Sequence, residues 1–72
     1  MRKFIVLHNA DFESSQPMIV YIDAIKYITP RVGKDEKIDA TNICLGNWVI
    51  SVQESISEVM KKIKEQENGT NK

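Results

Sequence analysis

Two side chains in this sequence could carry acid–base or covalent chemistry, and each stands alone. His8 is the only histidine, and this candidate general base ends an apolar run with no carboxylate at a recognisable spacing. Cys44 is the only cysteine, whereas a nucleophilic thiolate needs a positive, partly exposed setting such as a helix N-terminus. A structural zinc site normally takes about four Cys or His ligands. We therefore interpret His8 as a strand-end residue and Cys44 as a small buried or half-buried apolar residue, and we predict no catalytic residue.

Hydroxyl and acidic side chains suggest a second kind of chemistry, the binding of ions. Ser55 and Ser57 lie where a helix is expected to begin, and the N–H groups of a helix start can hold an anion. Glutamates next to these serines would repel phosphate. The spacing of the acidic residues also matches no metal-binding loop, such as the calcium loop; these residues are Asp35, Glu36, Asp39, Glu54 and Glu58. The sequence therefore predicts neither a metal site nor a cofactor.

Three aromatic residues, Tyr21, Tyr27 and Trp48, are the remaining candidates for function. On a sheet surface with the nearby basic residues they could stack nucleic-acid bases; those basic residues are Arg2, Lys3, Lys26 and Arg31. They could instead anchor a protein interface, where Trp and Tyr are over-represented, or Trp48 could fill the core beneath a helix. Ten Lys and Arg balance ten Asp and Glu, whereas nucleic-acid-binding domains usually carry a positive excess. The charge balance places nucleic acid last among these alternatives.

Alternating apolar residues predict the strands that must position these side chains. Phe4 to His8 and Met18 to Tyr21 are expected to pair as a hairpin. The short segment from Ile25 to Thr29 suits both a turn and a strand, and we interpret it as a turn at 22–24 followed by a strand to about Pro30. The charged stretch Gly33 to Lys37 predicts a solvated hairpin tip.

A second hairpin and a helix follow. Thr41 to Leu45 and Trp48 to Val52 flank Gly46-Asn47, a two-residue turn typical of tight hairpins. Ser55 with Glu58 predicts a capping box at the helix start, although Ser51 with Glu54 offers the same box one turn earlier. Asn68-Gly69 predicts the helix end. An apolar stripe at helical spacing is expected to lie on the sheet; its residues are Ile56, Val59, Met60 and Ile63. The fold class predicted is α+β, a small four-stranded, mostly antiparallel β-meander closed by one C-terminal α-helix, with a single domain over residues 1–67 and a frayed tail over 68–72.

Three patterns in this order resemble the FlbD-like group of small proteins (YlzI/FlbEa/FlbD). They are I-x-x-I-x-P from Ile25 to Pro30, T-x-I-x-L from Thr41 to Leu45, and V-x-E-S-x-x-E-V-x-x-x-I from Val52 to Ile63. The resemblance covers roughly residues 18–63. The chain departs from the group at Asn9 to Gln16, where the group has a glycine-containing hairpin, and in the longer, more charged loop from Arg31 to Asp39. The resemblance implies a strand-rich meander closed by a helix and a non-enzymatic accessory role.

The first strand suggests what the protein does. Phe4 and Val6 form one apolar face and Ile5 and Leu7 the other, whereas one helix can cover only one face of a sheet. A chain of 72 residues buries only about 60% of its unfolded surface, and so small a domain often depends on a partner subunit. We predict a non-enzymatic protein-interaction or scaffolding module that self-associates; a small nucleic-acid-binding regulator is the alternative. The predicted interface comprises Ile5, Leu7, Tyr21, Tyr27 and Trp48.

The N-terminal apolar run predicts where the protein resides. Phe4 to Leu7 is four residues long, whereas the core of a secretory signal needs about 7–15. No stretch approaches the roughly 20 apolar residues of a membrane span. We therefore expect a cytoplasmic protein without a membrane partner.

Overall fold

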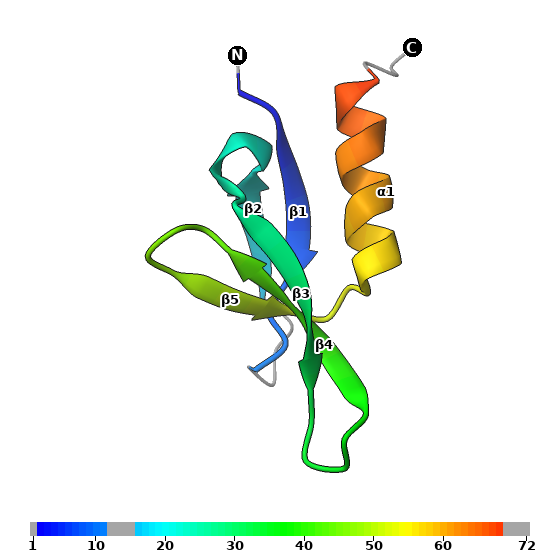
Figure 1. Ribbon diagram of the computed structural model, residues 1–72. Coiled ribbons are helices and arrows are strands. Elements are labelled where there is room, and N and C mark those ends of the chain that lie inside the picture. The colour runs from blue at the N-terminus through cyan, green and yellow to red at the C-terminus, as the bar shows by residue number, and fades with distance from the viewer. Residues whose placement is uncertain (1, 12–15, 69–72) are drawn as a thin grey trace.

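The computed structural model describes residues 2–11 and 16–68 and shows strands followed by one long helix (Figure 1). The elements in chain order are β1 (Phe4–His8), β2 (Pro17–Tyr21), a 3-10 helix (Ile22–Ala24), β3 (Tyr27–Val32), β4 (Ile38–Cys44), β5 (Val49–Val52) and α1 (Ile56–Glu67). Every strand pair among the described residues is antiparallel. The predicted α+β class with a C-terminal helix is confirmed, whereas the frayed tail falls mainly on residues 69–72, outside the described residues.

The strands form two sheets. β1 pairs with β2, and β3, β4 and β5 form a second sheet in that order. The predicted single four-stranded meander is therefore wrong. The 3-10 turn at Ile22–Ala24 and the two residues after it carry the chain away from β2, so β3 pairs with β4 instead of continuing the first sheet.

The two sheets meet where β1 and β5 end. Asn9 forms an isolated antiparallel bridge with Val52. The N–H of Gln53 donates to the carbonyl of His8 at 2.8 Å, and the N–H of Ala10 donates to the carbonyl of Ser51 at 3.0 Å. These bonds bring the inner faces of both sheets around one core.

The two predicted turns of the second sheet are confirmed. Gly33 to Lys37 joins β3 to β4, and the N–H of Gly33 donates to the carbonyl of Lys37 at 2.7 Å. Gly46-Asn47 joins β4 to β5, closed by a 2.7 Å bond from the N–H of Leu45 to the carbonyl of Trp48. Gly46 has a φ of 90°, a conformation that side chains with a Cβ rarely adopt. The glycine therefore fits the turn for a steric reason.

The helix α1 begins at the second of the two predicted capping boxes. The N–H of Glu58 donates to the Ser55 hydroxyl at 3.2 Å, and the Glu58 carboxylate accepts from the N–H of Ser55 at 2.9 Å. The earlier box is not used, because Ser51 lies within β5 and Glu54 contacts β1. Asn68 is the C-cap, as the predicted helix end required.

Removing this cap should have a measurable but modest effect. Ser55→Ala deletes the hydroxyl that accepts from Glu58, and we expect the free energy of unfolding to fall by about 1 kcal/mol. Chemical denaturation followed by circular dichroism measures this loss. Ser57→Ala is the matched control, because Ser57 is exposed and outside the capping box. Equal effects of the two substitutions would show that the cap contributes nothing specific.

The predicted apolar stripe of α1 is only partly buried. Val59 is fully buried and Ile63 packs against the core from a half-buried position. Ile56 and Met60 stay 36% and 51% exposed, so the expectation that all four side chains lie on the sheet is not met. The helix packs mainly against β1, with a smaller contact on β3. It therefore covers a narrow strip of the sheets, and two of its four apolar side chains stay exposed.

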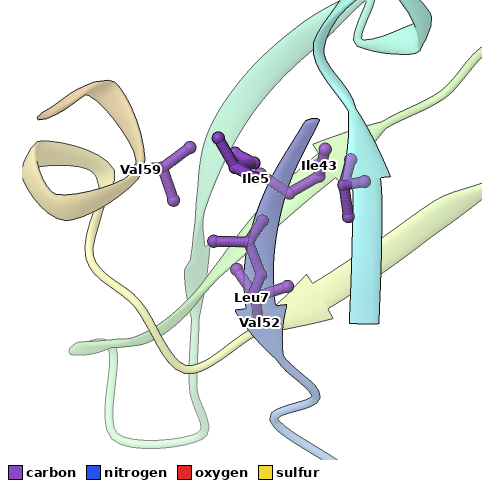
Figure 2. Close-up of a cluster of buried hydrophobic side chains, with 6 residues drawn as sticks. Ile5, Leu7, Ile43, Val52 and Val59 are labelled. Carbon is purple, nitrogen blue, oxygen red and sulfur yellow. The ribbon is translucent and has the colours of Figure 1, made fainter. Parts of the chain in front are cut away.

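The core lies between the two sheets and α1. Figure 2 shows Val59 of the helix pointing toward side chains from both sheets. The buried cluster comprises Ile5, Leu7, Val20, Ile43, Val52 and Val59. Cys44 is 5% exposed, which confirms its interpretation as a small buried residue.

Candidate functional site

The outer face of the first hairpin carries four large apolar side chains. Strand alternation turns Phe4 and Val6 of β1 away from the core, and Ile19 and Tyr21 of β2 stand directly opposite them. These side chains are 44%, 38%, 63% and 40% exposed in the order Phe4, Val6, Ile19, Tyr21. We call these four residues the hairpin face. The face is one patch made of two cross-strand pairs.

One end of the hairpin face is ordered by aromatic and cationic contacts. The rings of Phe4 and Tyr21 meet edge to face, with centroids 6.3 Å apart and an interplanar angle of 83°. The Arg2 guanidinium lies over the Tyr21 ring, 4.0 Å from its centroid, and hydrogen-bonds Asp23 at 2.7 Å. That hydrogen bond raises the pKa of Arg2 and lowers the pKa of Asp23. The charges at this border therefore balance each other.

The predicted interface residues of β1 lie on its buried side. Ile5 is 4% exposed and Leu7 is 0% exposed, and both belong to the core. Their assignment to an interface is therefore corrected, since the open face of β1 is the one formed by Phe4 and Val6. Two alternating apolar faces look alike in sequence, and only the position of the helix and the second sheet distinguishes them.

The three predicted aromatic residues are not brought together. Tyr21 lies on the first sheet, whereas Tyr27 and Trp48 belong to the second sheet and its turn. Trp48 is 72% exposed, which excludes the core alternative for this side chain. Tyr27 lies against Cys44, and the hydrogen bond with that thiol raises the pKa of the Tyr27 phenol. Tyr21 is therefore the one predicted aromatic that joins the hairpin face.

The basic residues interleaved with the aromatics are partly neutralised. Arg31 contacts two carboxylates, Asp11 at 2.8 Å and Asp39 at 3.0 Å. Arg2 is held by Asp23, as described above. Guanidinium groups paired in this way have less attraction left for phosphates. Arg2 and Arg31 are therefore less available to phosphates than their number in the sequence suggests.

His8 has a partner that sequence spacing did not reveal. The Glu54 carboxylate lies 2.6 Å from Nδ1 of His8 and also accepts from the His8 backbone N–H at 2.9 Å. Burial alone would raise the pKa of Glu54, but the hydrogen bonds from His8 outweigh it, and the pKa of Glu54 is lowered. The carboxylate is therefore ionised at neutral pH and can only accept, so Nδ1 carries the hydrogen.

The geometry of this pair suits a structural role. A carboxylate that orients an imidazole also occurs in general-base catalysis, where the base must reach a bound substrate. His8 does not line the cavity of about 240 Å³ next to β1, the groove of about 290 Å³ at the helix start, or the cavity of about 640 Å³ beside Arg2 and Glu67. The pair instead ties the end of β1 to the segment between β5 and α1.

The groove at the helix start also offers little for ion binding. Its carboxylates are already engaged, Asp39 by Arg31 and Glu54 by His8. Within residues 2–11 and 16–68, no group of three or more His, Cys, Asp or Glu side chains could hold a metal ion. Within the described part of the chain, no helix is long and apolar enough to cross a membrane.

Comparison with known proteins gives no further guidance on function. No family model, curated protein or solved structure matches this chain. The resemblance to the FlbD-like group stays a prediction, and the hairpin face is the surface on which a functional proposal can be built.

Proposed function

We propose that this protein is a small non-enzymatic interaction module that associates with a second copy of itself through the β1–β2 hairpin. The observation that carries the proposal is the hairpin face. Single exposed apolar residues are ordinary on soluble proteins. Four of them in two facing pairs form a contiguous patch, and contiguous apolar patches mark interaction sites.

The charge pattern supports a second copy as the partner. A two-fold interface brings the same patch of both subunits together, so a patch with a single sign of charge would repel itself. The hairpin face contains no ionisable acid or base apart from the Tyr21 phenol. At its border Arg2 and Asp23 are paired with each other. On the side of α1, Lys62 and Glu65 line a cavity together with Phe4 and Val6, and these two charges are also of opposite sign. The border of the hairpin face therefore does not carry a single sign of charge.

Measuring the mass in solution tests the proposal. We expect light scattering or sedimentation to report a dimer for the unmodified chain at micromolar concentration. Ile19→Glu should shift it to a folded monomer, because a carboxylate replaces the most exposed side chain of the hairpin face. Circular dichroism checks that the variant keeps its strands and helix.

Val49→Glu is the matched control for this experiment. Val49 is also β-branched and in a strand, and it is 60% exposed, close to the 63% of Ile19. It lies on the second sheet, so the control variant should stay dimeric. A monomer for the unmodified chain at its highest soluble concentration would refute self-association. Loss of the dimer in both variants would place the contact elsewhere.

A further inference from the structure

We infer that the free edge of β2 pairs antiparallel with the β2 edge of a second copy, about a two-fold axis at Ile19. This inference rests on the self-association proposed above and specifies its geometry: the two hairpin faces lie side by side in one sheet, with the Ile19 side chains of the two copies as cross-strand neighbours. The resulting sheet runs β1-β2-β2-β1 across the two copies. The pairing requires unbonded backbone groups of β2 that point away from β1.

Two hydrogen bonds at the ends of the hairpin fix the phase of the β1–β2 ladder. The N–H of Ile22 donates to the carbonyl of Lys3 at 3.0 Å, and the N–H of Asn9 donates to the carbonyl of Gln16 at 3.0 Å. In an antiparallel pair, hydrogen-bonded and non-hydrogen-bonded residue pairs alternate. Both bonds fit the observed register and a single ladder, in which the backbone N–H and C=O groups of every second residue of β2 point toward β1.

This phase divides the residues of β2 into two sets. Met18 and Val20 direct their N–H and C=O groups toward β1, whereas Pro17, Ile19 and Tyr21 direct theirs away. Among the described residues, β2 pairs with β1 alone. The outward row therefore offers the N–H groups of Ile19 and Tyr21 and the carbonyl groups of Pro17, Ile19 and Tyr21.

The composition of β2 leaves this row open to a partner. Strands at the edges of monomeric sheets are commonly protected by charged side chains, proline or bulges. The five residues PMIVY contain no charge, and β2 is paired with β1 in a continuous register. Their one proline, Pro17, is the first residue of the strand, so the centre of the outward row keeps its donor. The strand is therefore a template for a further antiparallel strand.

The positions of the outward groups select one register. With Ile19 opposite Ile19 of the second copy, these two residues exchange both of their N–H···O=C bonds. Tyr21 then stands opposite Pro17 of the second copy and donates to its carbonyl. Pro17 has no N–H to return, so the Tyr21 carbonyl gains no intermolecular bond and the pairing ends there. Each outward N–H group of β2 thus meets a carbonyl of its two-fold copy.

The other edge strands, β1, β3 and β5, are less suited to pairing. β1 and β5 are bonded to each other where they end, and α1 packs against β1. In β3, Pro30 occupies the middle of the strand, opposite Thr41, whose backbone groups face Val52 of β5. At such a position the nitrogen of β3 points away from β4, so proline removes a donor from the centre of the outward row. The helix α1 also packs beside β3. β2 is therefore the edge that a second copy can extend.

Amide hydrogen exchange on the full chain tests the pairing directly. In a sample diluted to monomer, the amides of Met18 and Val20 should exchange slowly and those of Ile19 and Tyr21 quickly. At a concentration where the dimer dominates, the exchange of Ile19 and Tyr21 should slow in proportion to the dimer fraction. Fast exchange of both amides in a proven dimer would overturn edge pairing and leave self-association standing, with the hairpin faces stacked instead.

The remaining outcomes are equally decisive. If the chain stays monomeric at every concentration, both the pairing and the proposed function fail. If Ile19 and Tyr21 exchange slowly in the monomer, the chain itself covers this edge, and the inference is wrong.

A pair of substitutions at one position separates the backbone from the side chain. Ile19→Pro removes the outward N–H but no bond to β1, whereas Ile19→Ala shortens the side chain and keeps the N–H. The proline variant loses two intermolecular bonds by symmetry, so its dimer dissociation constant should exceed that of the alanine variant by roughly 30-fold. Equal constants would show that the N–H takes no part. If the proline variant fails to fold, the exchange experiment on the unmodified chain still decides.

Discussion

Replacing Leu7 with alanine should lower the free energy of unfolding by about 2–5 kcal/mol, the usual range for a buried leucine. Leu7 is 0% exposed and belongs to the cluster between the two sheets and the helix (Figure 2). The truncation removes apolar contacts and leaves a cavity that the surrounding side chains close only in part. Small domains have about 5–15 kcal/mol of stability in total, so this is a large fraction. Urea denaturation followed by circular dichroism measures it.

Val49→Ala provides the control for Leu7→Ala. Val49 lies in a strand but is 60% exposed, so its truncation should change the stability by less than about 0.5 kcal/mol. A similar loss in the two variants would show that Leu7 is not a core residue. A charged residue at Leu7 or Ile5 should unfold the chain, because both side chains are buried. Charged substitutions at these two positions therefore cannot test self-association, because they would not give a folded monomer.

Glu54→Ala should also destabilise the protein strongly, with a loss of about 2 kcal/mol in the free energy of unfolding. The substitution removes the acceptor of two hydrogen bonds from His8, one from the ring and one from the backbone N–H. Bonds to a charged group contribute more than neutral ones, and an abandoned donor that is partly buried costs free energy as well. Chemical denaturation at neutral pH measures the loss. An unchanged stability would show that water replaces the carboxylate without cost.

The same carboxylate should make the stability depend on pH. The pKa of Glu54 is lowered in the folded protein from its ordinary value of 4.5, so the folded state binds its proton more weakly than the unfolded state. Its contribution is therefore complete above about pH 4.5 and is lost as the pH falls through the lower pKa of the folded state. Glu54→Gln keeps an acceptor without the charge and should lack this component. Parallel pH profiles for the two proteins would contradict the assignment; Asp23, whose pKa is also lowered, is common to both.

Local patterns in the sequence predicted the local structure well. The glycine turn at Gly46-Asn47, the charged tip from Gly33 to Lys37 and the capping box at Ser55 all depend on residues within a few positions of one another. Their physical causes, a positive φ, solvation and a hydroxyl near free N–H groups, are therefore visible in a short stretch. The C-terminal helix followed from its periodicity for the same reason.

Long-range features could not be predicted in this way. His8 and Glu54 are 46 positions apart, and no spacing rule links a strand end to a residue before a helix cap. The change of sheet after β2 depends on whether β3 pairs more favourably with β4 or with β2, which alternation alone does not decide. The same limit explains the hairpin face, since Phe4/Val6 and Ile5/Leu7 are equally apolar sets and only tertiary packing selects the buried one.

Because Cys44 is buried, the reactivity of its thiol can report local opening of the fold. The chain has a single thiol, and that thiol is 5% exposed on the central strand of the second sheet. A soluble thiol reagent can react only after the residues around Cys44 separate, so its reaction rate follows the population of opened molecules. The unmodified protein thus reports on the integrity of β3, β4 and β5 without an attached dye. Because the first sheet contains no cysteine, opening of that sheet alone gives no signal.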